Sequence, residues 1–126
     1  MPRPVHFEVH ASDPERAITF YATVFEWSFE RWGPHPYWSI TTGNGSGLDG
    51  GLLQREGPPP EKGAAVNAYP LTMEVAELDV TVREIEQAGG TVAEGKSAVP
   101  GVGWLAYCWD TEGNLFGLLE SDPSAE

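Results

Sequence analysis

The sequence predicts an α+β fold made of two tandem modules, each with the element order strand–helix–strand–strand–strand. The chain has 126 residues, which fits one domain. The same order of elements occurs twice, and two local motifs recur at a nearly constant offset, as in an internal repeat. Asp13 and Glu77, at the two helix starts, are 64 residues apart, and Gly51-Leu52-Leu53 recurs 66 residues later as Gly117-Leu118-Leu119.

The module boundaries follow from this repeat and from a proline-rich segment. Three consecutive prolines at positions 58–60, with glycines at 57 and 63, are typical of an exposed linker. We therefore expect one domain with four parts: module one at 1–56, linker at 57–65, module two at 66–121 and polar tail at 122–126.

Module one begins with a strand at 5–10, where apolar and polar residues alternate. A helix follows, with either Asp13 or Ser12 as its N-cap, because Pro14 suits the first helical position and Glu15 could complete a capping box. Its apolar residues have helical spacing as far as Phe25. The remaining strands are predicted at 27–32, 37–42 and 48–54.

Module two repeats this order. A strand is predicted at 69–75, then a helix that stops at Gly89-Gly90, a typical C-terminal signal. The remaining strands are predicted at 91–98, 103–109 and 115–120, with a hairpin turn at 110–114 in which Gly113 suits a positive φ.

Composition argues against several classes of partner and location. The net charge is −12, from 19 acidic and 7 basic side chains, so the chain lacks the basic surface that nucleic acids and anionic membranes require. No apolar run reaches the roughly 18 residues of a membrane-spanning helix, and residues 1–6 do not resemble a signal peptide. Cys108 is the only cysteine, which excludes an internal disulfide and suits the cytoplasm. We expect a cytoplasmic protein without nucleic-acid or membrane partners.

Several motifs together carry a resemblance to a known superfamily. They are Asp13-Pro14-Glu15-Arg16-Ala17 leading to Phe20-Tyr21, Phe25-Glu26-Trp27, Ala88-Gly89-Gly90, and Asp110-Thr111-Glu112-Gly113-Asn114 followed by Phe116-Gly117. In this order and at these spacings the chain resembles the vicinal-oxygen-chelate superfamily of glyoxalases, bleomycin-resistance proteins and extradiol dioxygenases. The resemblance implies the fold of that superfamily, with two curled sheets around a central cavity, and a homodimer. Glu26 departs from the pattern, because relatives often have glycine there, and this predicts a less favourable turn at the helix end.

The resemblance also implies where a divalent metal ion would bind in metal-dependent members. The four ligand positions fall on His6, near Gly51, on Pro70 and on Gly117. Glycine and proline have no donor side chain, and a catalytic site normally needs about three protein ligands. We therefore expect no cofactor and no metal, with His6 as the only residue that matches a ligand position.

The candidate catalytic residues are His6, Glu8, His10 and Glu74. On a strand, the first three point to one face while Val5, Phe7 and Val9 point to the other. A histidine could act as general base with Glu8 as its partner, or the three could form a solvated polar face. Glu74 falls on the matching strand of module two, so Glu8 and Glu74 could meet across the cavity, which would raise one pKa, or both could be solvated.

The candidate ligand-binding residues are mostly aromatic. Tryptophan and tyrosine suit a flat or apolar ligand because they combine a large ring with a polar atom. The candidates are Tyr37, Trp38, Thr72, Trp104, Tyr107 and Trp109. The sequence leaves open which face of strands 37–42 and 103–109 lines a cavity, and the alternative for any one aromatic is a place in the core or in a dimer interface.

These observations predict a metal-independent protein that binds a small apolar or aromatic molecule. The alternative is a lyase, isomerase or dioxygenase of the same superfamily that uses His6 with nearby carboxylates, with or without a divalent metal. A third hypothesis is a protein that serves mainly in protein interactions, which large exposed aromatic patches would favour.

Overall fold

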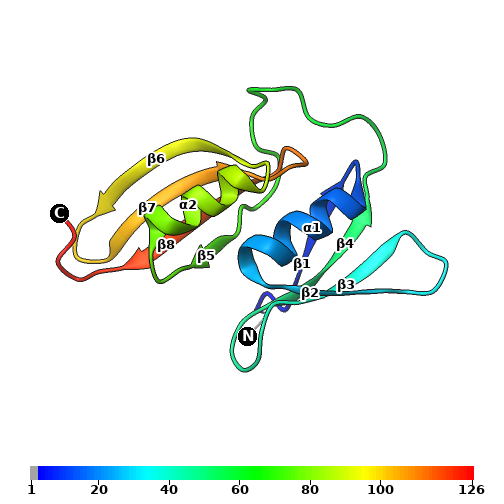
Figure 1. Cartoon of the computed structure of the whole chain (residues 1–126), viewed down its shortest axis with the longest axis horizontal. Helices are drawn as coiled ribbons and strands as arrows, with labels where there is room; N and C mark the ends of the chain where they lie inside the picture. Colours follow the sequence, from blue (N-terminus) through cyan, green and yellow to red (C-terminus); the bar gives the residue numbers. More distant parts are fainter. Residues whose placement is uncertain (1–2) are drawn as a thin grey trace. The chain divides into compact units, whose positions relative to one another are not determined.

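The computed structural model describes residues 3–126, and the chain divides into two compact units at Pro59–Pro60. The first unit holds β1 (His6–Ala11), α1 (Pro14–Phe25), β2 (Ser28–Arg31), β3 (Tyr37–Thr41) and β4 (Asp49–Gln54). The second unit holds β5 (Thr72–Glu74), α2 (Leu78–Gln87), β6 (Thr91–Val99), β7 (Gly103–Trp109) and β8 (Leu115–Ser121). The predicted α+β fold with the order βαβββ in tandem is confirmed (Figure 1).

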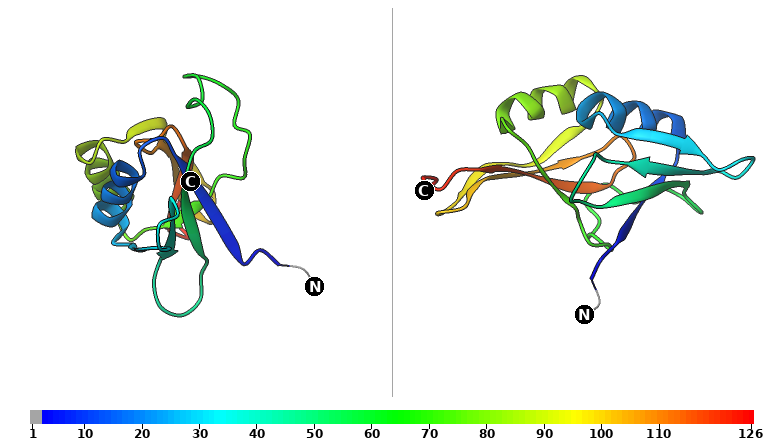
Figure 2. Two further views of the ribbon diagram at one scale, coloured as in Figure 1. Left: turned by 90° about the vertical axis from the view of Figure 1, so that its right-hand side faces the viewer. Right: turned by 90° about the horizontal axis from the view of Figure 1, so that it is seen from below.

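The two units have the same sheet topology. The strand order is β1-β4-β3-β2 in the first sheet and β5-β8-β7-β6 in the second. The outer strands β1 and β5 run parallel to their neighbours β4 and β8, and the other pairs are antiparallel. In each unit the helix covers one face of its own sheet (Figure 2). Each sheet therefore has a helix-covered face and a second face, which we call the open face.

Both helices begin where the repeat predicts. Asp13 is the N-cap of α1, and its side chain accepts a hydrogen bond from the Arg16 backbone N–H at 3.2 Å. Glu77 is the N-cap of α2 with a similar extended backbone, but its side chain forms no capping bond. Asp13, rather than Ser12, therefore makes the capping bond of α1.

The helix ends differ between the units. Helix α2 is followed by Gly89, which has φ 100°, as the predicted stop signal requires. Helix α1 instead ends at Glu26, which has φ 60° and ψ 29° and whose backbone N–H still bonds to the Ala22 carbonyl. Among the described residues, Glu26 is the only non-glycine residue with a positive φ. The departure seen in the sequence thus coincides with a left-handed backbone position that favours glycine.

The cores lie between each helix and its sheet. In the first unit Phe20 and Tyr21 of α1 and Ile40 and Leu52 of the sheet are buried, and the Tyr21 and Trp27 rings stack at 4.9 Å. In the second unit the largest buried side chains come from both layers, and they are Leu78, Ile85, Cys108, Phe116 and Leu118. Neither helix could cross a membrane, since α1 has 12 residues and α2 has 10, and the described chain holds no other helix.

Two segments differ from their sequence prediction. Strand β5 begins at Thr72 rather than at residue 69, because Pro70 has no N–H to donate and Tyr69 is fully exposed. Residues 122–126, expected to be a polar tail, form a closed turn in which Ala125 is buried and its carbonyl accepts a hydrogen bond from Gly101.

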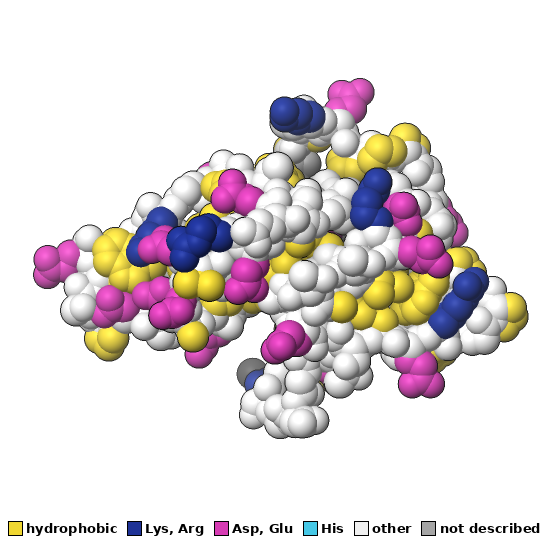
Figure 3. Space-filling view, in the orientation of Figure 1, with side chains coloured by type: hydrophobic (Ala, Val, Ile, Leu, Met, Phe, Trp, Pro, Cys, Tyr) yellow, Lys and Arg dark blue, Asp and Glu magenta, His cyan; other side chains and the backbone are white. Residues whose placement is uncertain are grey.

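Acidic side chains are spread over the visible surface rather than gathered in one patch (Figure 3). Basic side chains lie among the acidic ones (Figure 3). Lys96 of β6 pairs with Asp79 of α2 at 3.2 Å. On the visible face the negative charges therefore form no single concentrated patch.

Candidate functional site

The polar residues of β1 lie on the open face of the first sheet. His6, Glu8 and His10 are exposed, whereas Val9 and Ala11 between and after them are buried toward α1. This alternation follows from the side-chain period of two in a strand. The predicted common face of the two histidines and Glu8 is confirmed.

Two weak hydrogen bonds organise this face. His10 Nε2 lies 3.4 Å from Glu8 Oε1, and the Tyr37 hydroxyl of β3 lies 3.4 Å from His6 Nε2. An imidazole can accept a proton, a carboxylate can stabilise the imidazolium, and a phenol can donate or accept a hydrogen bond. The group is able to support acid–base chemistry, and its use in catalysis stays a prediction.

Glu74 and Thr72 occupy the corresponding positions in the second unit. Both are exposed on β5, and Met73 between them is half-buried. Thr72 is paired in register with Gly117 of β8, as Glu8 is paired with Gly51 of β4. The equivalence of the two strands is confirmed, while a meeting of Glu8 with Glu74 remains a prediction.

Gly51 and Gly117 lie beneath polar side chains of neighbouring strands. A Cβ atom built on Gly51 would overlap the hydroxyl and ring of Tyr37. A Cβ atom built on Gly117 would lie 2.8 Å from Thr72 Oγ1 and 3.3 Å from the Tyr107 ring. Each glycine therefore permits a close approach that any larger residue would prevent.

These contacts bear on whether a divalent metal fits. The positions that the resemblance assigns to the second and fourth ligands carry no donor, and the space above them is occupied by Tyr37 in one unit and by Thr72 and Tyr107 in the other. Within residues 3–126, no three histidine, cysteine, aspartate or glutamate side chains lie close enough to hold a metal ion. The residues present do not fit the metal site of the superfamily, and metal independence itself stays a prediction.

The six predicted ligand-binding residues divide between the two faces. Tyr37 pairs with Leu53 and lies on the open face of the first sheet. Thr72 and Tyr107 both pair with Gly117, and Trp109 pairs with Leu115. These three residues therefore lie on the open face of the second sheet.

Trp38 and Trp104 lie on the helix-covered faces. Arg31 stacks over Trp38 at 5.0 Å, and Lys96 lies 4.9 Å from the Trp104 ring. Trp104 Nε1 donates a hydrogen bond to Asp122 at 3.0 Å. The pKa of Asp122 is lowered mainly by hydrogen bonds from Ser124 and, to a smaller extent, by this bond from Trp104. These contacts give both tryptophans structural partners on that face, and a ligand-binding role for them stays a prediction.

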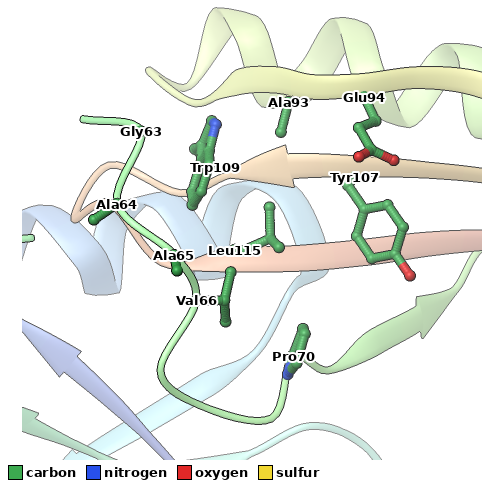
Figure 4. A pocket seen from close by; sticks show the side chains of 10 residues that line it. All are labelled: Gly63, Ala64, Ala65, Val66, Pro70, Ala93, Glu94, Tyr107, Trp109 and Leu115. Carbon is green, nitrogen blue, oxygen red and sulfur yellow. The ribbon is translucent and has the colours of Figure 1, made fainter. Parts of the chain in front are cut away.

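A pocket of about 470 Å³ lies on the open face of the second sheet. Its wall on the sheet side is formed by Tyr107 and Trp109 of β7 and Leu115 of β8 (Figure 4). The opposite wall comes from residues 63–70, which cross in front of the sheet before β5 and which we call the strap. Two of the predicted residues, Tyr107 and Trp109, are thus brought together in one pocket.

Glu94, which is not among the residues predicted from the sequence, also lines this pocket. In β6, Val92 pairs with Cys108 but Glu94 pairs with Tyr107, so Ala93 is an extra residue that forms a β-bulge. Strict alternation would place Glu94 on the helix-covered face, and the bulge moves it to the open face. Gly95, a glycine inside the strand, is the sequence signal that could have indicated an irregularity here. It does not specify which residue is extra, because that depends on pairing with the neighbouring strand.

Cys108 is not part of the open face. It is fully buried between α2 and the sheet, and burial, with a smaller effect of Glu86, raises the pKa of its thiol to about 11. A thiol with so high a pKa is a weak nucleophile near neutral pH. Cys108 therefore acts as a core residue.

Comparisons with known proteins agree with this fold. The sequence model of a family described as "Glyoxalase-like domain" matches residues 6–119. No curated protein matches the sequence.

Solved structures show the same fold at low identity. Hypothetical protein SA1046 from S. aureus is 22% identical with a TM-score of 0.70, over 95% of this chain and 98% of that one. A glyoxalase/bleomycin resistance protein/dioxygenase family enzyme from Burkholderia phytofirmans PsJN is 17% identical with a TM-score of 0.74, over 93% and 97%. The fosfomycin resistance protein FosX from Listeria monocytogenes is 14% identical with a TM-score of 0.73, over 97% and 93%.

Proposed function

Because the chain belongs to the glyoxalase-like domain family of the vicinal-oxygen-chelate superfamily, we propose that it binds a small apolar or aromatic molecule without the help of a metal ion. The observation that carries the proposal is the pocket on the open face of the second sheet, which places Tyr107 and Trp109 side by side above Leu115. Its volume of about 470 Å³ lies within the range of small-molecule sites.

The chemistry of the wall supports an aromatic or apolar ligand. Indole and phenol rings offer large apolar faces, and each carries a polar atom at its edge. Val66, Pro70 and Leu115 add aliphatic surface around the rings. A flat molecule inserted between the strap and β7 would therefore lose contact with water on both faces.

The proposal of metal independence rests on the chain's own residues. Gly51 and Gly117 lack donor atoms, and larger side chains there would collide with Tyr37, Thr72 and Tyr107. We expect metal analysis by mass spectrometry, after incubation with nickel, zinc, manganese or iron(II), to find less than stoichiometric metal. A stoichiometric ion that disappears in His6→Ala would contradict the proposal.

The binding proposal is tested by a diverse small-molecule screen that measures thermal stability. A ligand at 100 times its Kd adds about 2.7 kcal/mol to the free energy of unfolding. Trp109→Leu should weaken binding of any compound found. The matched control is Trp32→Leu, which makes the same change at an exposed tryptophan outside the pocket and should leave the Kd unchanged. A broad screen without any stability shift would refute the proposal.

One observation favours an enzymatic alternative. His6 and Tyr37 are within 3.4 Å of each other on the open face of the first sheet, and Glu8 is beside His10. We infer that if the protein is a lyase, isomerase or dioxygenase, His6 is its general base. His6→Ala should then abolish turnover while the circular dichroism spectrum stays unchanged, and His35→Ala, in an exposed turn, is the matched control. Turnover that survives His6→Ala would remove this role.

Two further expectations accompany the proposal. We propose that the chain forms a homodimer and that it resides in the cytoplasm. Light scattering on the purified protein tests the homodimer, and a monomeric mass at high concentration would contradict it.

A further inference from the structure

We propose that the pocket beneath the strap selects planar aromatic ligands that carry a positive charge, and that Glu94 is the residue that recognises this charge. The inference rests on the proposed binding function and adds to it the chemical class of the ligand.

Strand pairing fixes the position of Glu94. The β-bulge at Ala93 turns Glu94 to the open face, where its Cα is paired with that of Tyr107. In Figure 4 its carboxylate lies beside the Tyr107 ring, at the edge of the pocket. A carboxylate is therefore held next to the aromatic wall by the backbone of two paired strands.

The charge of the pocket comes from Glu94. Among the described residues that line it, Glu94 is the only charged one. No basic side chain within residues 3–126 forms an ion pair with Glu94, and Lys96, two positions along β6, is paired with Asp79 of α2. The pocket thus carries one negative charge without a counter-ion from the described part of the chain.

The aromatic wall of the pocket also favours a cation. The faces of tyrosine and tryptophan rings carry negative potential and attract cations, by about 0.5–1 kcal/mol at exposed sites. Tyr107 and Trp109 therefore favour the same sign of ligand charge as Glu94 does. An anionic ligand would meet this carboxylate in a protein whose net charge is −12, which disfavours it further.

The shape of the pocket suits a flat ligand. The strap supplies aliphatic side chains, among them Val66 and Pro70, opposite the two rings. A flat ring system fills the gap between two such walls better than a branched aliphatic molecule does. The volume of about 470 Å³ accommodates a bicyclic or tricyclic ring system.

The test uses three bicyclic probes that differ in charge: 1-methylquinolinium as the cation, quinoline as the neutral molecule at mildly alkaline pH, and 2-naphthoate as the anion. Isothermal titration calorimetry should give a Kd for the cation about threefold to tenfold lower than for quinoline, with 2-naphthoate the weakest. Added salt should reduce the preference, because the carboxylate is exposed.

Two variants locate the charge effect. Glu94→Gln should lower the ratio of the quinoline Kd to the 1-methylquinolinium Kd to the part that the aromatic rings supply. Glu84→Gln, which makes the same change of charge on an exposed position of α2 away from the pocket, should leave the preference intact.

The outcomes separate this inference from the function on which it rests. Suppose that quinoline binds and that Trp109→Leu weakens its binding. If the cation then has no advantage, or keeps its full advantage in Glu94→Gln, charge selection by Glu94 is wrong and the proposed binding function is retained. If none of the probes binds, the assignment of bicyclic aromatic cations is overturned, and the broad screen decides the binding function by itself.

Discussion

Replacing Glu26 by glycine should stabilise the protein, because Glu26 ends α1 in a left-handed conformation. Its φ of 60° and ψ of 29° bring the Cβ of an L-residue close to the following carbonyl, at a cost of roughly 1–2 kcal/mol. Glycine adopts this conformation without that contact. The backbone hydrogen bond from residue 26 to the Ala22 carbonyl, at 3.1 Å, does not depend on the side chain and should persist.

The net effect is smaller than the conformational cost. Glycine has more freedom in the unfolded chain, which offsets about 0.5–1 kcal/mol. Removing a negative charge from the C-terminal end of a helix adds about 0.3–1 kcal/mol, because that end carries partial negative charge. We therefore expect Glu26→Gly to raise the free energy of unfolding by about 1 kcal/mol, and Tm by roughly 3–5 °C.

The control for charge is Glu26→Gln, which keeps the left-handed strain and removes only the charge. It should contribute only the effect of the charge, about 0.3–1 kcal/mol. Urea and thermal unfolding followed by circular dichroism measure both variants beside the unmodified protein. If Glu26→Gly is no more stable than Glu26→Gln, the backbone at position 26 is not strained and the reasoning is wrong.

Three other predictions concern the caps, the open face and the core. Asp13→Ala should cost about 1 kcal/mol in chemical unfolding, while Glu77→Ala should cost little because its side chain makes no capping bond. Gly51→Ala should destabilise by about 1–3 kcal/mol, since its Cβ would overlap Tyr37, and adding Tyr37→Ala should recover part of this loss; simple additivity of the two changes would contradict the contact. The Cys108 pKa of about 11, raised from 9.0, predicts a stabilisation of the folded protein that is complete below pH 9 and is lost as the pH rises toward 11. Near pH 8, the native protein should react with a thiol reagent at least about 100-fold more slowly than urea-unfolded protein.

Much of the fold could be predicted because its signals are local. The alternation around Glu8 indicated β1, the cap at Asp13 indicated the start of α1, and the stop at Gly89-Gly90 indicated the end of α2. Each of these depends on residues within a few positions along the chain. The recurrence of the pattern after the linker then predicted the duplicated topology.

The candidate site was less predictable, because its parts meet through sheet pairing. The aromatic character of 103–109 was visible in the sequence, but the face of each ring was not, and Trp104 proved to lie opposite to Tyr107 and Trp109. The two faces of the strand could not be told apart from composition, since both carry tryptophan. The burial of Ala106 and Cys108 shows which face α2 covers.

The sequence by itself therefore determined the order and type of the elements, the repeat, and the absence of donor side chains at Gly51 and Gly117. The tertiary structure alone decided that Tyr37 lies over Gly51 and that Glu94 reaches the pocket through the bulge at Ala93. The physical reason is that helix and strand periodicities arise from neighbouring residues, whereas register, bulges and the packing of side chains over glycine arise from contacts between strands far apart in the sequence.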